Sequence, residues 1–159
     1  MKRRSPQLAL RLDAGRPDAL AGWRDGRSLP YLGGTVTLRL DTAHEQARLD
    51  EGGQLHLPLP PGAAPRQIQD AAESWLRANA LRVVGAQVTM AARHLGPAAP
   101  TVALCFAARA GWLEADGKGG LRCHWRLIEQ PIEVIADVAA KAVAALPARE
   151  ATPDLFAAA

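Results

Sequence analysis

Few residues in this chain could carry out metal or nucleophile chemistry. Its four histidines are His44, His56, His94 and His124. None has a second metal-binding residue three or four positions away on an expected helix, so a zinc site could arise from them only through folding, and solvent-exposed or capping roles are simpler. The only cysteines, Cys105 and Cys123, form neither a disulfide framework nor a paired metal motif. We expect both thiols to be buried and reduced. The spacing of the candidate residues alone predicts no catalytic constellation, no metal and no cofactor.

The composition of the chain limits the classes of protein to which it can belong. The chain has 159 residues, 48% of them hydrophobic, and a formal net charge of +3. This is typical of one soluble domain. The longest uncharged stretch, residues 95–108, contains two prolines and is too short to cross a membrane. The basic start is followed by charged residues instead of an apolar run, so we expect a cytoplasmic protein. The arginines are scattered, which makes nucleic acid a weak expectation.

Alternating apolar residues predict two strands in the N-terminal half. Residues 34–40 place Val36, Leu38 and Leu40 on one face, and residues 55–59 alternate leucine with other side chains. We expect these strands to pair in an antiparallel arrangement. Pro58 lacks a backbone donor and should place the second strand at a sheet edge. A shorter alternation at residues 8–12 suggests a frayed strand.

A long amphipathic helix is expected from Pro65 to about residue 94. Its predicted apolar stripe consists of Ile68, Ala72, Trp75, Leu76, Asn79, Val83, Ala86 and Met90.

The C-terminal half predicts a hairpin and a second helix. Strand-like segments at 101–107 and 121–128 are separated by a Gly-rich turn at 116–120, which lacks the Lys-Ser/Thr of a phosphate-binding loop. An Ala-rich helix should run from about 132 to 146. These elements predict one α+β domain over residues 24–156, with an N-terminal arm at 1–23 and a tail at 157–159.

In this order the segments resemble the YgjP-like metallopeptidase family, zinc-dependent gluzincin relatives that are also akin to the SprT-like proteases. The Leu-Pro-Tyr-Leu-Gly element of that family stands intact at residues 29–33. Trp75 resembles the tryptophan of the family's long helix. Trp112 and the run His124-Trp125-Arg126-Leu127 occupy the places of its Trp-Gly-Ser-Cys and Asn-Trp-Arg-Leu elements. The resemblance implies a zincin-like scaffold with an N-terminal antiparallel β region, one long helix, a β-hairpin and a C-terminal former active-site helix.

The family's His-Glu-x-x-His motif is lost. Alignment from Pro131 puts the two helix histidines on Lys141 and Ala145, the general-base glutamate on Ala142 and the third ligand on Ala151. In the motif, imidazoles at positions i and i+4 bind zinc from one helix face. Alanine has no donor atom, and a lysine of ordinary pKa, about 10.4, must lose a proton before it can coordinate. The resemblance therefore implies a degenerate metal site and no zinc hydrolysis.

We expect a pseudoenzyme that binds a peptide or protein beside an edge strand. The candidate binding residues are Trp112, His124, Trp125, Arg126 and Lys141. Core packing is the alternative for the tryptophans, and a structural ion pair is the alternative for Arg126. Lys141 is either a solvated helix charge or the partner of Glu114 in the former metal position.

Two other functions stay open. One is a hydrolase rebuilt around His124, Glu114 and Cys123. The other is a nucleic-acid-binding module, based on the net charge and on the similarity to DNA-associated SprT-like proteases. The oligomeric state is not predicted.

Overall fold

A computed structural model describes residues 20–95, 99–106 and 111–147 of the chain. Within these residues the chain divides into two compact units: 20–30 with 35–75, and 31–34 with 76–147. The strand expected at residues 8–12 and the position of Ala151 lie outside the described residues. The single-domain boundaries expected at 24 and 156 stay a prediction.

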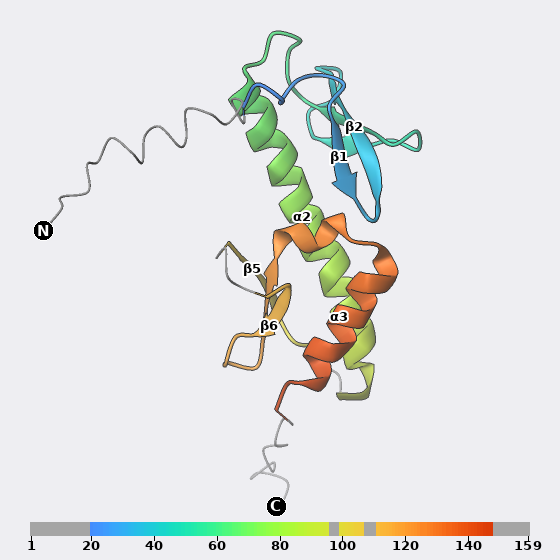
Figure 1. Ribbon diagram of the computed structural model, residues 1–159, viewed down its shortest axis with the longest axis vertical. Helices are drawn as coiled ribbons and strands as arrows, with labels where there is room; N and C mark the ends of the chain where they lie inside the picture. The colour runs from blue at the N-terminus through green and yellow to red at the C-terminus, as the bar shows by residue number, and fades with distance from the viewer. Residues whose placement is uncertain (1–19, 96–98, 107–110, 148–159) are drawn as a thin grey trace, which may run out of the picture. The chain divides into compact units, whose positions relative to one another are not determined.

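Strands and helices are both present in the described chain (Figure 1), which confirms the α+β class. The elements in order are β1 (Ser28–Tyr31), β2 (Gly34–Leu40), β3 (Arg48–Leu49), β4 (Gln54–Leu57), α2 (Pro65–Ala91), η1 (Ala92–Leu95), β5 (Val102–Cys105), β6 (Leu113–Ala115), β7 (Leu121–His124), η2 (Trp125–Glu129) and α3 (Ile132–Ala144).

The sheet of the first unit has the strand order β1-β2-β4-β3. β2 and β4 are parallel, with Thr37 opposite Gln54 and Leu40 opposite Leu57, so the predicted antiparallel pairing is wrong. The chain reverses into the short strand β3 and reverses again into β4, its antiparallel partner. Two reversals return β4 to the direction of β2.

The expected edge position of the second strand is also wrong, because β4 is paired on both sides. The strand ends at Leu57, one residue before Pro58, so the missing donor of the proline lies beyond the ladder. The alternation itself is confirmed: Val36 and Leu38 on β2, and Leu55 and Leu57 on β4, are buried.

A tight turn joins β1 to β2 at the intact Leu-Pro-Tyr-Leu-Gly element. Its central residues Leu32 and Gly33 have φ of 47° and 78°, the positive values that two-residue hairpin turns require. Their amides donate to the carbonyl oxygens of Ile128 at 2.8 Å and Glu129 at 3.1 Å. A Cβ on Gly33 would lie 2.8 Å from Cγ of Pro131, so both backbone conformation and space select glycine there.

We expect Gly33→Ala to lower the free energy of unfolding by more than Gly26→Ala does. Gly26 also has a positive φ, of 80°, but nothing lies within 4 Å of a Cβ there, so its substitution reports the backbone cost alone. That cost is about 1–2 kcal/mol for an L-residue. Urea denaturation measures both. Gly34→Ala, where the nearest atom is 3.7 Å away, is the neutral control. Equal effects of Gly33→Ala and Gly34→Ala would contradict the turn described.

The second unit contains a three-stranded sheet of order β5-β7-β6, with β5 parallel and β6 antiparallel to β7. The expected hairpin of residues 101–107 and 121–128 is therefore wrong, because the hairpin partner of β7 is the short strand β6. The strand predicted for 121–128 ends early, at His124, because the chain turns into the 3₁₀ segment η2. Nδ1 of His124 accepts the amide of Arg126 at 3.3 Å and caps this segment. The predicted turn before β7 is confirmed: Oδ1 of Asp116 accepts the amides of Lys118 and Gly120.

Both predicted helices are present. α2 continues into η1, which ends at Leu95, close to the expected end, and α3 ends two residues before the expected 146. The predicted stripe of α2 is buried at Ile68, Ala72, Leu76 and Val83 and partly buried at Trp75 and Asn79. Ala86 and Met90 are exposed, and Val84 and Val88 are buried instead. No helix in the described ranges is long and apolar enough to span a membrane.

Candidate functional site

The three described positions onto which the resemblance aligns the zinc motif do not fit a zinc ion. Lys141 on α3 and the C-cap residue Ala145 are exposed, whereas Ala142 belongs to the buried face of α3. Nζ of Lys141 lies 2.6 Å from Oδ2 of Asp137, one helical turn earlier, and the two side chains are 76% and 62% exposed. These positions therefore offer a paired ammonium and two methyl groups, none of which coordinates a divalent cation.

The expected pairing of Lys141 with Glu114 is not formed. Glu114 instead accepts the amide of Gly111 at 3.0 Å through Oε1. Asp137 is the closer partner because residues four apart on a helix face one another. An ion pair with this exposure contributes little to folding. Lys141 is thus a solvated helix charge.

Four of the five predicted binding residues gather at one end of the three-stranded sheet. The register places Cys105 beside His124, so Phe106 follows β5 at the end where β7 finishes. Trp112 precedes β6, and its carbonyl oxygen accepts the amide of His124 at 3.0 Å. Aromatic and cationic side chains meet here, and we term them the sheet-end cluster: Arg77, Phe106, Trp112, His124, Trp125 and Arg126.

Ring and guanidinium contacts hold the sheet-end cluster together. The rings of Trp112 and His124 meet edge to face, with centroids 6.1 Å apart. The guanidinium of Arg77 lies 5.4 Å from the ring centroid of Phe106 and 5.6 Å from that of Trp125. Cations at such distances are attracted to the ring faces.

Much of the sheet-end cluster is exposed to solvent. Phe106 is 62% exposed and Trp112 is 47% exposed, although both are large and apolar. The guanidinium of Arg126 lies 5.3 Å from the ring centroid of Trp125 and 3.9 Å from the carboxylate of Glu129. Arg126 therefore forms the expected ion pair while its side chain stays exposed. Exposed aromatic side chains beside arginine are typical of binding surfaces.

Sequence reasoning missed Phe106 and Arg77. Phe106 had a usable signal, because it is the one aromatic residue in the predicted strand at 101–107. No pattern in the sequence indicated Arg77, because its position over the rings of Phe106 and Trp125 depends on how α2 packs within the second unit.

The geometry does not support a hydrolase rebuilt on His124, Glu114 and Cys123. Cys123 is fully buried, and burial raises the pKa of its thiol to about 12. Successive residues of a strand point to opposite faces, so the imidazole of His124 points away from that thiol. Nδ1 of His124 is already used by the amide of Arg126. No nucleophile and base pair is formed among these residues.

An α+β unit with a long helix, a small mixed sheet and a second helix behind a proline defines a small zincin-like domain. Comparison with protein families agrees: residues 6–140 match the YgjP-like metallopeptidase domain, and the chain belongs to that family. The match ends at Ala140, the residue before Lys141. No curated protein and no solved structure matches the chain.

Proposed function

We propose that this chain is a non-catalytic member of the YgjP-like metallopeptidase family that binds an extended peptide or protein segment at the sheet-end cluster. One observation carries the loss of catalysis: the positions of the zinc ligands and the general base hold Lys141, Ala142 and Ala145, and the lysine is paired with Asp137. Without an ion and without a glutamate, no group there activates water.

The binding role is supported by the exposed aromatics and by the strands beside them. In the described sheet, β5 and β6 are each paired on one side, by β7. An extended peptide can add to such an edge through backbone hydrogen bonds, while neighbouring side chains supply selectivity. Phe106 and Trp112 lie next to these two edges, where they would contact the side chains of the peptide.

A displayed library of random peptides, presented to the full chain in the presence of a metal chelator, tests this role. We expect selected peptides to bind wild-type protein and to lose at least tenfold in affinity with Trp112→Ala or Phe106→Ala, because truncating a central aromatic costs about 2 kcal/mol or more. Met90→Ala is the matched control, since Met90 is an apolar residue of α2 with 54% exposure. Selection of no peptide, or equal binding by all variants, would refute the binding role.

A protease assay tests the loss of catalysis separately. We expect no cleavage of an unfolded protein substrate by wild-type chain with added Zn²⁺. Cleavage that is abolished by chelator and by Lys141→Ala would overturn the proposal. A steep loss of single-stranded DNA binding with rising salt would favour the nucleic-acid alternative instead.

A further inference from the structure

A second group of potential ligands lies in the first unit, on residues that the zinc motif does not include. Asp41 directly follows β2, His44 lies three residues later, and His56 is on β4 opposite Arg39. Because β2 and β4 are parallel, their carboxyl ends meet at one edge of the sheet. The amide of Asp41 continues the ladder by donating to the carbonyl oxygen of Leu57 at 2.9 Å. The fold thus brings together side chains that lie up to 15 residues apart.

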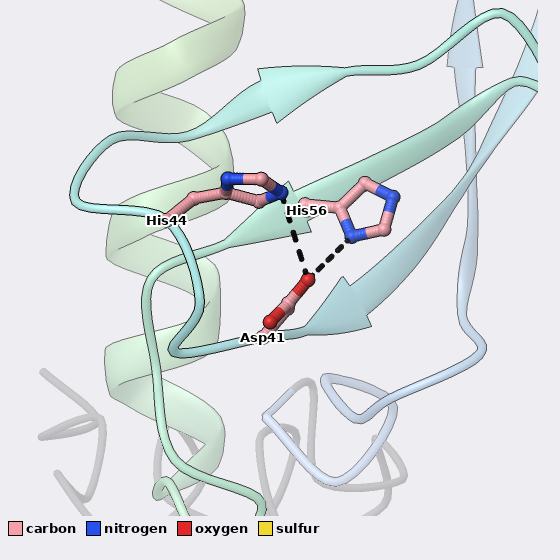
Figure 2. A group of neighbouring side chains, drawn as sticks. All are labelled: Asp41, His44 and His56. Carbon is pink, nitrogen blue, oxygen red and sulfur yellow. Dashed lines mark hydrogen bonds and ion pairs between the residues drawn. The ribbon is translucent and has the colours of Figure 1, made fainter.

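The carboxylate of Asp41 lies between the two imidazole rings (Figure 2). Its Oδ2 is 3.1 Å from Nδ1 of His56 and 3.8 Å from Nε2 of His44. One ligand atom from each of the three residues lies within 4.8 Å of the others. Oδ1 of Asp41 accepts the amide of Ala43 at 2.8 Å, which fixes the carboxylate and leaves Oδ2 directed at the rings.

These separations are close to those that a zinc ion imposes. Bonds of about 2.0–2.2 Å in a tetrahedron place neighbouring ligand atoms about 3.3–3.6 Å apart. The two distances from Asp41 lie on either side of that range. For all three residues to bind one ion, His44 has to move slightly. Its side chain is 36% exposed and lies in the loop after β2, so no core residue has to move.

Asp50 supplies the outer contact that metal-binding histidines usually have. Its Oδ2 lies 3.0 Å from Nε2 of His56, and its Oδ1 accepts the amide of Gln54 at 2.8 Å. When Nε2 donates its proton to Asp50, Nδ1 presents its lone pair towards Asp41 and His44. This carboxylate-histidine arrangement fixes the ring and raises its basicity as a ligand.

The charges around His56 also favour a cation. The carboxylates of Asp41 and Asp50 flank the imidazole of His56, 3.1 Å from its Nδ1 and 3.0 Å from its Nε2. A divalent cation between Asp41, His44 and a neutral His56 balances both carboxylate charges.

We infer that Asp41, His44 and His56 bind a divalent first-row transition-metal ion, with Asp50 as the residue that positions His56. Two imidazole nitrogens and one carboxylate oxygen suit Zn²⁺, whereas Mg²⁺ and Ca²⁺ prefer oxygen ligands alone. Three protein ligands leave one tetrahedral position for water or an external ligand. The site belongs to the first unit and shares no residue with the sheet-end cluster or with α3.

Metal titration of the full chain tests the inference. After chelation and dialysis, we expect the protein to bind one equivalent of Zn²⁺, to show visible absorption bands with Co²⁺, and to melt at a higher temperature with either ion. His44→Ala should weaken Zn²⁺ binding at least tenfold and remove the Co²⁺ bands. Asp50→Asn should weaken binding about 10–100-fold, as loss of an outer-shell partner does.

His94→Ala is the matched control and should bind Zn²⁺ like the wild type. His44→Ala is the primary variant because the partly exposed His44 can be truncated without opening the core. Absence of Zn²⁺ binding by wild-type protein would overturn the inference, as would unchanged binding by His44→Ala. His44→Ala should not affect peptide binding, so failure of the metal site and failure of the proposed function are distinguishable.

Discussion

Replacing Leu127 with alanine is expected to lower the free energy of unfolding by about 2–5 kcal/mol, the usual cost of emptying a fully buried leucine site. Leu127 has no exposed surface and lies in η2, between the exposed Arg126 and the buried Ile128. The loss combines the transfer of apolar surface to water with a cavity that η2 closes only partly. Because η2 also carries Trp125, the same substitution should weaken peptide binding at the sheet-end cluster.

Urea denaturation followed by tryptophan fluorescence measures the cost of Leu127→Ala. Leu81→Ala is the matched control: the same chemical change on α2, at a residue that is 37% exposed. It should cost well under half as much. If the two variants have equal midpoints, η2 is not packed as described.

Alkylation of Cys123 in the native protein is expected to be slower than that of an unperturbed thiol by a factor on the order of a thousand at pH 8. The thiolate is the reactive form, and burial raises the pKa of Cys123 to about 12, with a smaller contribution from Cys105. The rate should therefore increase about tenfold for each pH unit, without a plateau below about pH 12.

Cys105→Ala leaves Cys123 as the sole thiol, and Cys123→Ala leaves the partly exposed Cys105 as the comparison. Iodoacetamide labelling with and without urea measures both. In urea the two thiols should react alike. Native labelling of Cys123 as fast as in urea would contradict its burial.

The raised pKa of Cys123 also makes the free energy of unfolding depend on pH. The direction of this dependence follows from the number of protons that the folded and unfolded states bind. Above an unfolded pKa of about 8.5, the unfolded chain releases the thiol proton that the folded chain retains. The unfolded state then binds fewer protons, so the contribution of Cys123 is fully present below that pH and is lost as pH rises towards about 12.

The side chains that could bind a metal ion do not lie at the positions where the resemblance places the zinc site of the family. The resemblance places the family's zinc ligands on Lys141 and Ala145 and its general base on Ala142, whereas imidazole nitrogens and a carboxylate oxygen gather at the end of β2 and β4. The inferred metal site is therefore not a remnant of the zinc motif. In the first unit, metal binding would fasten the loop after β2 to β4.

Elements with a local pattern of apolar residues could be predicted from the sequence. Apolar steps of three and four residues gave α2 and α3, and alternation gave the buried faces of β2 and β4. The alignment from Pro131 to Ala145 predicts that the zinc motif is lost. The resemblance also supplied Trp112, His124, Trp125 and Arg126 as candidate binding residues, without predicting that they gather.

The pairing of strands and the grouping of distant side chains could not be predicted and are known from the folded chain. A two-residue strand such as β3 has too little pattern to be predicted, yet it makes β4 parallel to β2. That parallel pairing brings His56 to Asp41 and His44, which no helical spacing in the sequence connects. The physical reason is that the spacing of apolar residues along the chain specifies which face of a helix or strand is buried. The direction of a strand and the strand beside it depend instead on contacts between residues far apart in sequence.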